Sequence, residues 1–318
     1  KDCQNRSVVT TPTEIVKYMV EKTLANVCVG KTPTEILNIK VADIACGSGI
    51  FLEEVFDYLQ DYCVQWYINA GQTEHLVEIG VDLYKLPLEE KKAILCSCIY
   101  GIDIDIHAVE VAKFSLLIKL IDDETAPSVA EVTPILPDLT PNIHFGNSLV
   151  SQIELSEISV SSEQLIEIVP FDWAEINGGN CFDVIIGNPP YVNTEGMHTL
   201  LPNTEVEIYK KKYKTSHKQF DKYFIFIEQA INKIKDNGYV CYIVPNKFFK
   251  IGAGEKLRNL IAKDHLLVSI DDFGDAQLFE DKTIYSSIIL LSKKMQSAFV
   301  YSNIDSANKL WAGEETNS

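Results

Sequence analysis

Apolar runs rich in β-branched residues alternate along this chain with longer stretches in which apolar positions recur at helical spacing. This alternation is typical of a parallel sheet with helices on both faces. The seven strands that it predicts are Lys40–Ala45, Ile99–Ile104, Asn142–Phe145, Phe182–Gly187, Gly238–Val244, Leu267–Phe273 and Ser286–Ser292. The predicted helices are Thr13–Asn26, Ile50–Ala70, Leu88–Cys96, Ile106–Ile121, Tyr223–Asp236 and Gly254–Lys263.

Two stretches of the chain follow neither pattern. Thr125–Thr140 contains three prolines and Ser151–Ser162 is rich in serine, so both are predicted to be loops or insertions. One dominant alternating pattern over 318 residues favours a single α/β domain over two equal halves.

The charge balance narrows the classes of function. The chain has 28 Lys+Arg against 45 Asp+Glu, a formal net charge of −17. This surplus of acid argues against a chain that coats nucleic acid non-specifically, because neutralising phosphates requires a surplus of Lys and Arg. The 46% of hydrophobic residues can supply a sizeable core and excludes global disorder.

The eight cysteines are scattered, without a Cys-x-x-Cys pair or a histidine placed to complete a zinc site. We therefore expect free thiols, a cytoplasmic location and no metal. The longest apolar runs fall short of the roughly 18–20 residues of a membrane span, so we expect no membrane partner.

A glycine turn is the first candidate binding site. Residues 43–49, DIACGSG, join a predicted strand to a predicted helix. Gly47 and Gly49 let the backbone turn sharply and let a ligand approach the main chain, while the helix behind them offers free N–H groups. A dinucleotide-binding turn would need a third glycine where this chain has Leu52. Asp43 before the turn suits a cationic ligand better than a pyrophosphate.

Two further acids, Asp103 and Asp105, follow the next predicted strand. Ligands of parallel sheets bind at the carboxyl ends of strands, where an acid can accept bonds from both hydroxyls of a ribose, and Asp103 is the candidate for that role. The alternative is that both are turn residues or helix caps, and Asp105 is placed to cap the helix at Ile106. The long separation from the glycine turn predicts an inserted helical segment at about 57–98.

The most specific feature is the run Asn188-Pro189-Pro190-Tyr191 directly after a buried strand. The two prolines hold the chain extended and rigid. The side-chain oxygen of Asn188 and the main-chain oxygen of Pro189 can accept both hydrogens of one NH₂ group, and Tyr191 offers a flat face to a planar substrate. Such an arrangement activates an adenine amine or a carboxamide toward a methyl donor. The alternative is a strand-terminating proline turn with a packed tyrosine.

With these motifs the sequence resembles the S-adenosylmethionine-dependent N6-adenine DNA methyltransferases. It is most similar to the modification portion of type IIG restriction-modification enzymes and to type I modification subunits. The resemblance extends from about Val8 to about Lys294, and the motifs follow the γ-type order. Thr10-Thr11-Pro12 comes first, and the glycine turn, the acid pair, the run HFGNS at residues 144–148 and the Asn-Pro-Pro-Tyr loop follow.

The resemblance implies a class I methyltransferase (Rossmann-like) fold, an α/β fold with a mostly parallel seven-stranded sheet and helices on both faces. It implies a catalytic domain over residues 1–295, with the helical insertion at about 57–98 and loop insertions at about 122–141 and 149–180. Residues 296–318 would begin a linker toward a C-terminal target-recognition domain. Because the chain starts without methionine, we expect it to be a segment of a longer polypeptide.

The resemblance also implies roles for matching residues. Asp103 would hold the ribose hydroxyls of S-adenosylmethionine and Ile104 would pack against its adenine. Asn147 stands where many relatives have an acid that bonds the adenine amine, and its amide oxygen can accept the same bond. Tyr191 and Phe279 would contact the extruded substrate base. The implied cofactor-binding set is Thr11, Pro12, Asp43, Ala45, Gly47, Ser48, Gly49, Asp103, Ile104, Asn147, Ser148 and Asn188, and the implied catalytic set is Asn188, Pro189, Pro190 and Tyr191.

The function implied is methyl transfer to the N6 amine of an adenine flipped out of double-stranded DNA, by a site-specific adenine methyltransferase of a restriction-modification or phage-defence enzyme. The partners would be DNA, bound through the missing recognition domain, and a specificity or restriction subunit or domain. The alternatives are methylation of a protein glutamine amide or of an RNA adenine, and a catalytically idle cofactor-binding subunit of a defence complex.

One local basic concentration follows the Asn-Pro-Pro-Tyr loop. It comprises Lys210, Lys211, Lys212, Lys214, Lys218 and Lys222. It is either a solvated loop or a contact to the DNA backbone at the mouth of the pocket. Given the net charge, we expect this segment alone to bind the cofactor and to bind DNA poorly.

Overall fold

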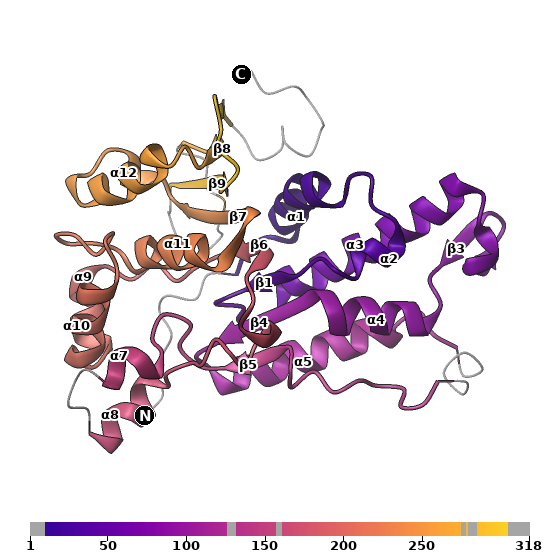
Figure 1. The fold of residues 1–318 in the computed structure, drawn as a ribbon, viewed down its shortest axis with the longest axis horizontal. Coiled ribbons are helices and arrows are strands. Elements are labelled where there is room, and N and C mark those ends of the chain that lie inside the picture. Colours follow the sequence, from indigo (N-terminus) through magenta and orange to yellow (C-terminus); the bar gives the residue numbers. More distant parts are fainter. Residues whose placement is uncertain (1–9, 126–131, 157–160, 275–277, 279–284, 305–318) are drawn as a thin grey trace.

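The computed structural model describes residues 10–125, 132–156, 161–274, 278 and 285–304 (Figure 1). Eight strands form one sheet in the order β10-β8-β9-β7-β6-β1-β4-β5. Neighbouring strands are parallel, except that β9 is antiparallel to both β7 and β8. The strands of this sheet are β1 (Val41–Asp43), β4 (Ile99–Asp103), β5 (Ile143–Phe145), β6 (Phe182–Gly187), β7 (Ile234–Pro245), β8 (Leu267–Asp272), β9 (Ser286–Ser292) and β10 (Val300–Asn303).

Helices occupy most of the remaining described chain. They are α1 (Thr13–Cys28), α2 (Pro33–Ile36), α3 (Ile50–Ala70), α4 (Leu88–Cys98), α5 (Ile106–Ile121), α7 (Gln152–Ser156), α8 (Ser162–Ile168), α9 (Thr194–Leu200), α10 (Asn203–Lys212), α11 (Lys222–Lys233) and α12 (Glu255–Lys263). Between α3 and α4 lies a separate antiparallel hairpin, β2 (Val77–Gly80) and β3 (Leu83–Lys85). In Figure 1 this hairpin lies at the opposite end of the molecule from α7 to α10.

Both faces of the sheet are buried, because successive side chains along its strands belong to two different hydrophobic cores. Val184 and Ile186 of β6 belong to the core formed with α1, α3, α4 and α5, whereas Ile185 between them belongs to the core formed with α10, α11 and α12. Ile243 and Val244 of β7 divide in the same way. Because successive strand residues point to opposite faces, continuous apolar strands require helices on both sides.

The predicted fold class is confirmed, and the predicted number of strands is wrong by one. The bounds predicted for β6, β9, α3 and α5 agree with the structure. The additional strand is β10, which pairs with β8 and lies past the predicted domain boundary at residue 295. Three of its four residues are exposed, so its sequence lacks the apolar pattern from which a strand can be predicted.

Three smaller predictions are also corrected. The helix predicted to end at Asp236 ends at Lys233, because β7 already begins at Ile234 beside Phe182 of β6. The serine-rich stretch predicted as a loop contains α7. The predicted helical insertion at 57–98 contains the β2–β3 hairpin as well as helices.

One ion pair fastens α1 to the far part of the sheet. Lys22 Nζ lies 2.5 Å from Asp271 Oδ2, and the Tyr18 hydroxyl donates to the same oxygen at 3.1 Å. Asp271 is buried in β8, so its charge depends on these two donors. Burial and the Asp271 carboxylate raise the pKa of Tyr18, which therefore remains a donor.

We expect Lys22→Met to lower the free energy of unfolding by about 1–3 kcal/mol, because the substitution leaves the buried Asp271 carboxylate without its counter-charge. Urea unfolding measures this. Lys17→Met is the matched control, because Lys17 is an exposed lysine of the same helix and should change stability by less than about 0.5 kcal/mol. Equal effects of the two substitutions would show that the ion pair does not contribute.

Candidate active site

The predicted site residues gather at the carboxyl ends of three adjacent strands. From β1 the chain proceeds outward through β4 to β5 and then returns to β6 on the other side of β1, so the direction of strand addition reverses at β1. Asp43 ends β1, Asp103 ends β4 and Asn188 directly follows β6. A crevice at such a switch point is the usual ligand site of an open α/β sheet.

The glycine turn is fastened to the end of β4 by Asp103. The Gly47 N–H donates to Asp103 Oδ2 at 2.8 Å, and the Asp105 N–H donates to Asp103 Oδ1 at 2.8 Å. Gly47 has a φ of +53°, and a Cβ added to it would meet no atom within 4 Å. The turn therefore needs glycine for its backbone conformation and leaves open space on its outer side. Asp105 caps α5 by accepting from the His107 N–H at 2.9 Å, which confirms the capping interpretation for that residue.

Asp43 is a buried acid in contact with two motifs. Asp43 is only 2% exposed, and its Oδ1 accepts from the Ala45 N–H at 3.0 Å. A Cβ on Gly187 would lie 2.6 Å from Asp43 Oδ1, so the backbone before Asn188 passes directly over this carboxylate. Burial raises the pKa of Asp43 to about 8, and the charge of Asp103 contributes in the same direction. Burial likewise raises the pKa of Asp103 despite its backbone hydrogen bonds.

The amide of Asn188 is oriented by hydrogen bonds at both of its ends. Its Nδ2 donates to Thr11 Oγ1 at 3.0 Å, and its Oδ1 accepts from the Tyr191 hydroxyl at 2.5 Å. The same hydroxyl lies 2.9 Å from the carbonyl oxygen of Ile243. Burial raises the pKa of Tyr191, so the phenol keeps its proton and acts as a donor. The structure thus brings together Thr11 and the Asn-Pro-Pro-Tyr loop, which are predicted to share one site.

The Tyr191 ring packs against a second tyrosine in a T-shaped arrangement. It meets the ring of Tyr223 at a centroid distance of 6.0 Å and an interplanar angle of 82°. Tyr191 remains partly exposed, whereas Tyr223 is buried in α11. A T-shaped contact of this kind fixes the orientation of the Tyr191 ring.

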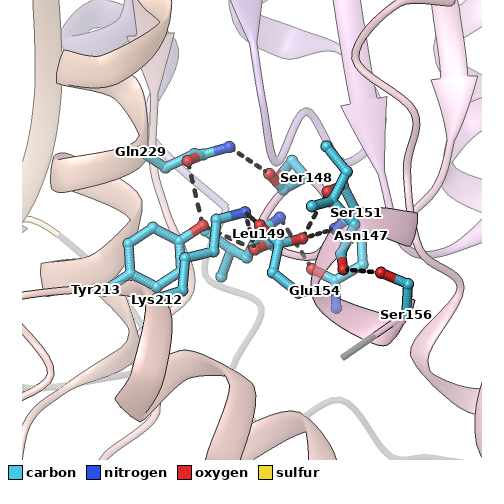
Figure 2. Close-up of polar contacts among 10 residues, drawn as sticks. Asn147, Ser148, Leu149, Ser151, Glu154, Ser156, Lys212, Tyr213 and Gln229 are labelled. Carbon is cyan, nitrogen blue, oxygen red and sulfur yellow. Dashed lines mark hydrogen bonds and ion pairs between the residues drawn. The ribbon is translucent and has the colours of Figure 1, made fainter. Parts of the chain in front are cut away.

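The loop after β5 is clamped by α10 and α11 (Figure 2). The carbonyl oxygen of Leu149 accepts from Lys212 Nζ at 3.0 Å and from the Tyr213 hydroxyl at 2.7 Å. Gln229 Nε2 donates to the carbonyl oxygen of Ser148 at 2.9 Å. These bonds join the edge of the sheet to segments more than fifty residues further along the chain.

Asn147 and Ser148 are engaged by protein atoms. Asn147 Oδ1 accepts from the Leu149 N–H at 3.1 Å, and its Nδ2 donates to Glu205 Oε1 at 3.0 Å. The Ser148 hydroxyl donates to the carbonyl oxygen of Ile44 at 2.6 Å. The amide oxygen for which a ligand contact is predicted is therefore already bonded to the backbone.

Sequence reasoning missed Glu205 and Tyr209, which lie side by side on the inner face of α10. Both are buried, and the Tyr209 hydroxyl donates to Glu205 Oε1. The signal that could have found them is a glutamate four residues before a tyrosine on a helix whose apolar positions, including Val206 and Ile208, face inward.

The six lysines that follow the Asn-Pro-Pro-Tyr loop do not form one basic loop. Lys210, Lys211 and Lys212 form the last turn of α10, and Lys212 pairs with Glu154 at 2.8 Å. Lys222 is buried, with its Nζ 5.6 Å from the ring centroid of Tyr209. A lysine in that position cannot reach a DNA backbone.

Some predictions lie outside the described residues or concern absences. Phe279 is outside the described residues.

Within the described ranges, no group of three or more His, Cys, Asp and Glu side chains is arranged to hold a metal ion. In the same ranges no helix is both long enough and apolar enough to cross a membrane. The seven cysteines in the part of the chain that the structure describes are free, namely Cys28, Cys46, Cys63, Cys96, Cys98, Cys181 and Cys241.

Known proteins share this fold at low sequence identity. The structure of the DrdV–DNA complex matches with a TM-score of 0.62 at 17% identity, over 98% of this chain and 30% of that one. A protein of Listeria monocytogenes, described as a class I S-adenosylmethionine-dependent methyltransferase, matches with a TM-score of 0.54 at 17% identity, over 96% of this chain and 69% of that one. The fold is that of the class I methyltransferases, and S-adenosylmethionine is the cofactor that this fold and the family below imply.

Sequence comparison identifies the family. The type II restriction enzyme and methyltransferase RM.Eco57I of Escherichia coli is 44% identical over 311 residues, which cover 98% of this chain and 30% of that protein. The chain thus spans less than a third of that relative's length. Residues 97–279, more than half of the chain, match the Eco57I restriction-modification methylase family. The chain therefore belongs to the Eco57I restriction-modification methylase family.

Proposed function

We propose that this chain is a methyltransferase catalytic domain that transfers a methyl group from S-adenosylmethionine to the N6 amine of an adenine flipped out of double-stranded DNA. The observation that carries the proposal is the Asn188 amide, held by Thr11 and Tyr191 directly beside the buried carboxylate of Asp43. An oriented amide oxygen next to a site for a cationic ligand suits methylation of an amine. Family membership supports the same conclusion.

The residues present fit S-adenosylmethionine. The open side of the glycine turn at Gly47 accommodates the close approach of a ligand, and the Asp103 carboxylate retains lone pairs for the ribose hydroxyls. Ile104 is 42% exposed beside Asp103, where an aliphatic side chain can pack against adenine. Asp43 would face the cationic methionine end, over which Thr11 and Pro12 would close. When bound, the cofactor supplies a methyl group on a positively charged sulfur, which keeps the electron pair of the broken bond.

The chain's own part in the reaction is to orient the amine. In the proposed reaction Asn188 Oδ1, which accepts from Tyr191, also accepts one amine hydrogen, while the Pro189 carbonyl accepts the other. Two acceptors draw the hydrogens out of the plane of the base, so the nitrogen lone pair localises toward the methyl group. After transfer the excess proton leaves the amine for solvent.

The substrate base would reach the site by flipping. Extrusion costs about a few kcal/mol of unstacking. Stacking on an aromatic face returns about 1–3 kcal/mol per base, and the partly exposed face of Tyr191 is placed for it. The side chains that would fix the DNA sequence belong, in this proposal, to a target-recognition domain that follows residues 296–318. A restriction-modification or phage-defence enzyme in the cytoplasm is the setting proposed, and the acidic net charge of −17 fits a catalytic domain that leaves DNA binding to another domain.

We expect Asn188→Ala to lower kcat for adenine methylation by about 10²–10³-fold, because it removes an oriented acceptor. Binding of S-adenosylhomocysteine, measured by calorimetry, should stay within about twofold of wild type. Tyr191→Phe should lower the rate less, since the ring remains while the hydroxyl bond to Asn188 is lost. Asn26→Ala, at an exposed position of α1, is the control with no expected change. Loss of ligand binding together with methylation would contradict this role for Asn188.

We expect Asp43→Asn to stabilise the ligand-free protein at high pH and to have little effect at low pH. The unfolded carboxyl titrates near its ordinary value of about 3.9, whereas burial raises the folded pKa to about 8. Between those values the native state holds a proton that the unfolded chain releases, so wild-type stability falls as pH rises through this window and levels off above about pH 8. Asparagine does not titrate.

Urea unfolding of wild type and Asp43→Asn at pH 5, 7 and 9 measures this difference. The stability gain should be smallest at pH 5, larger at pH 7 and largest at pH 9, because pH 5 lies only about one unit above the unfolded pKa. Asp264→Asn serves as the control, because Asp264 is exposed. A gain that stays constant across the three pH values would contradict the burial argument.

A further inference from the structure

Glu205 carries a buried carboxylate oxygen that no described residue pairs with. The residue is 1% exposed and lies on the inner face of α10. Its Oε1 accepts from Asn147 Nδ2 at 3.0 Å and from the Tyr209 hydroxyl. Its Oε2 is buried and has no hydrogen-bond partner among the described residues. A buried polar oxygen without a donor is costly, so this position calls for a donor from outside the described chain.

The unpaired oxygen lies beside the edge of the proposed adenosine site. Asp103 and Phe145 are register partners on the adjacent strands β4 and β5, and the Gly146 N–H donates to the carbonyl oxygen of Asp103 at 2.8 Å. The next residue, Asn147, contacts Glu205. The proposed ribose-binding acid and the Glu205 carboxylate are therefore joined through one short segment of backbone.

Lys222 offsets the charge of Glu205 without occupying its free oxygen. Within the described residues Lys222 Nζ forms no ion pair, and it lies over the ring of Tyr209 at 5.6 Å. Burial lowers the pKa of Lys222, while the carboxylates of Glu205 and Asp103 both act to raise it. The positive charge of Lys222 therefore favours the ionised forms of both acids.

The clamp on the neighbouring loop holds Glu205 in position. Lys212 and Tyr213 bind the Leu149 carbonyl, and Leu149 in turn donates its N–H to Asn147 Oδ1 (Figure 2). Asn147 is thus turned so that its NH₂ group meets Glu205. The two side chains act as a pair in which asparagine supplies the donor and glutamate presents an acceptor to its surroundings.

We propose that Oε2 of Glu205 accepts a hydrogen bond from the adenine amine of S-adenosylmethionine, so that α10 supplies the base-specific contact of the cofactor site. This assignment rests on the proposed function, because it requires the adenosine end of the cofactor to lie between Asp103 and Asn147. A carboxylate oxygen accepts and cannot donate. It therefore favours a 6-amino purine over a 6-oxo purine, whose oxygen would meet it with lone pairs on both sides.

The test compares S-adenosylhomocysteine with S-inosylhomocysteine, its deaminated analogue, by calorimetric binding to the intact protein. Wild type should bind the adenosyl ligand about 10–100-fold more tightly, the range expected for one hydrogen bond to a charged group. In Glu205→Gln the amide oxygen keeps the bond from Asn147 and the NH₂ group turns toward the ligand. The affinity ratio should then fall to about one or invert.

Two control variants separate base recognition from general damage. Glu207→Gln changes an exposed glutamate two residues further along the same helix and should leave the ratio unchanged. Asp103→Asn should weaken both ligands alike, because both have the same ribose. Glu205→Asp keeps the charge but withdraws the carboxylate by one methylene, so it should also reduce the affinity ratio. It replaces Glu205→Gln in the test if that variant does not fold.

The outcomes distinguish this assignment from the proposed function. Failure of wild type to bind S-adenosylhomocysteine would overturn the proposed function and this assignment with it. Binding with a wild-type ratio near one, or a ratio unchanged in folded Glu205→Gln or Glu205→Asp, overturns the assignment alone. A purely structural role for Glu205 predicts that unchanged ratio, with only the unfolding midpoint of the variants lowered.

Discussion

The parallel pairing of β6, β1 and β4 is the constraint on which the site depends. Val41 of β1 lies in register with Val184 on one side and Ile99 on the other, so the three strands end at the same edge of the sheet. There the backbone of Gly187 passes so close to the Asp43 carboxylate that a single Cβ would overlap it. The binding turn and the Asn-Pro-Pro-Tyr loop are therefore in direct contact, and neither can shift without the other.

Burial of acids at this edge gives the site its electrostatic character. Asp43 is buried and Asp103 is partly buried, neither forms an ion pair within the described residues, and burial disfavours their charged forms. A ligand that brings positive charge to this edge relieves that penalty, whereas an anion would add to it. The acidic net charge of the chain thus has a local counterpart where the cofactor is proposed to bind.

The segments after β6 pack against the loop at the β5 edge of the sheet. α10 and α11 bind the loop after β5 through Lys212, Tyr213 and Gln229, and this attachment brings Glu205 against Asn147. The same attachment explains why the lysine-rich stretch is not a free basic loop. Its lysines are divided among a helix end, an ion pair and a buried position, because the helix docks on the loop with its inner face.

The sequence by itself determined the features that depend on neighbouring residues. Apolar periodicity is a local property, so the strands β6 and β9 and the helices α3 and α5 could be predicted with their ends. Glycine permits left-handed backbone conformations and proline restricts its own backbone, so the turn and the rigid loop were also visible in the sequence. The cap was visible for a similar reason, because Asp105 caps the helix that follows it directly.

Only the tertiary structure decided which distant side chains meet. Thr11 and Asn188 are 177 positions apart, and Asn147 and Glu205 are 58 apart. Nothing in the residues adjacent to Glu205 indicates that its partner follows β5, because that pairing results from the docking of α10 on the sheet edge. For the same reason the burial of Lys222 and the pairing of the mostly exposed β10 with β8 could not be predicted. A side chain's local sequence limits its backbone conformation, but its solvation and its partners are set by the packing of segments far away in the chain.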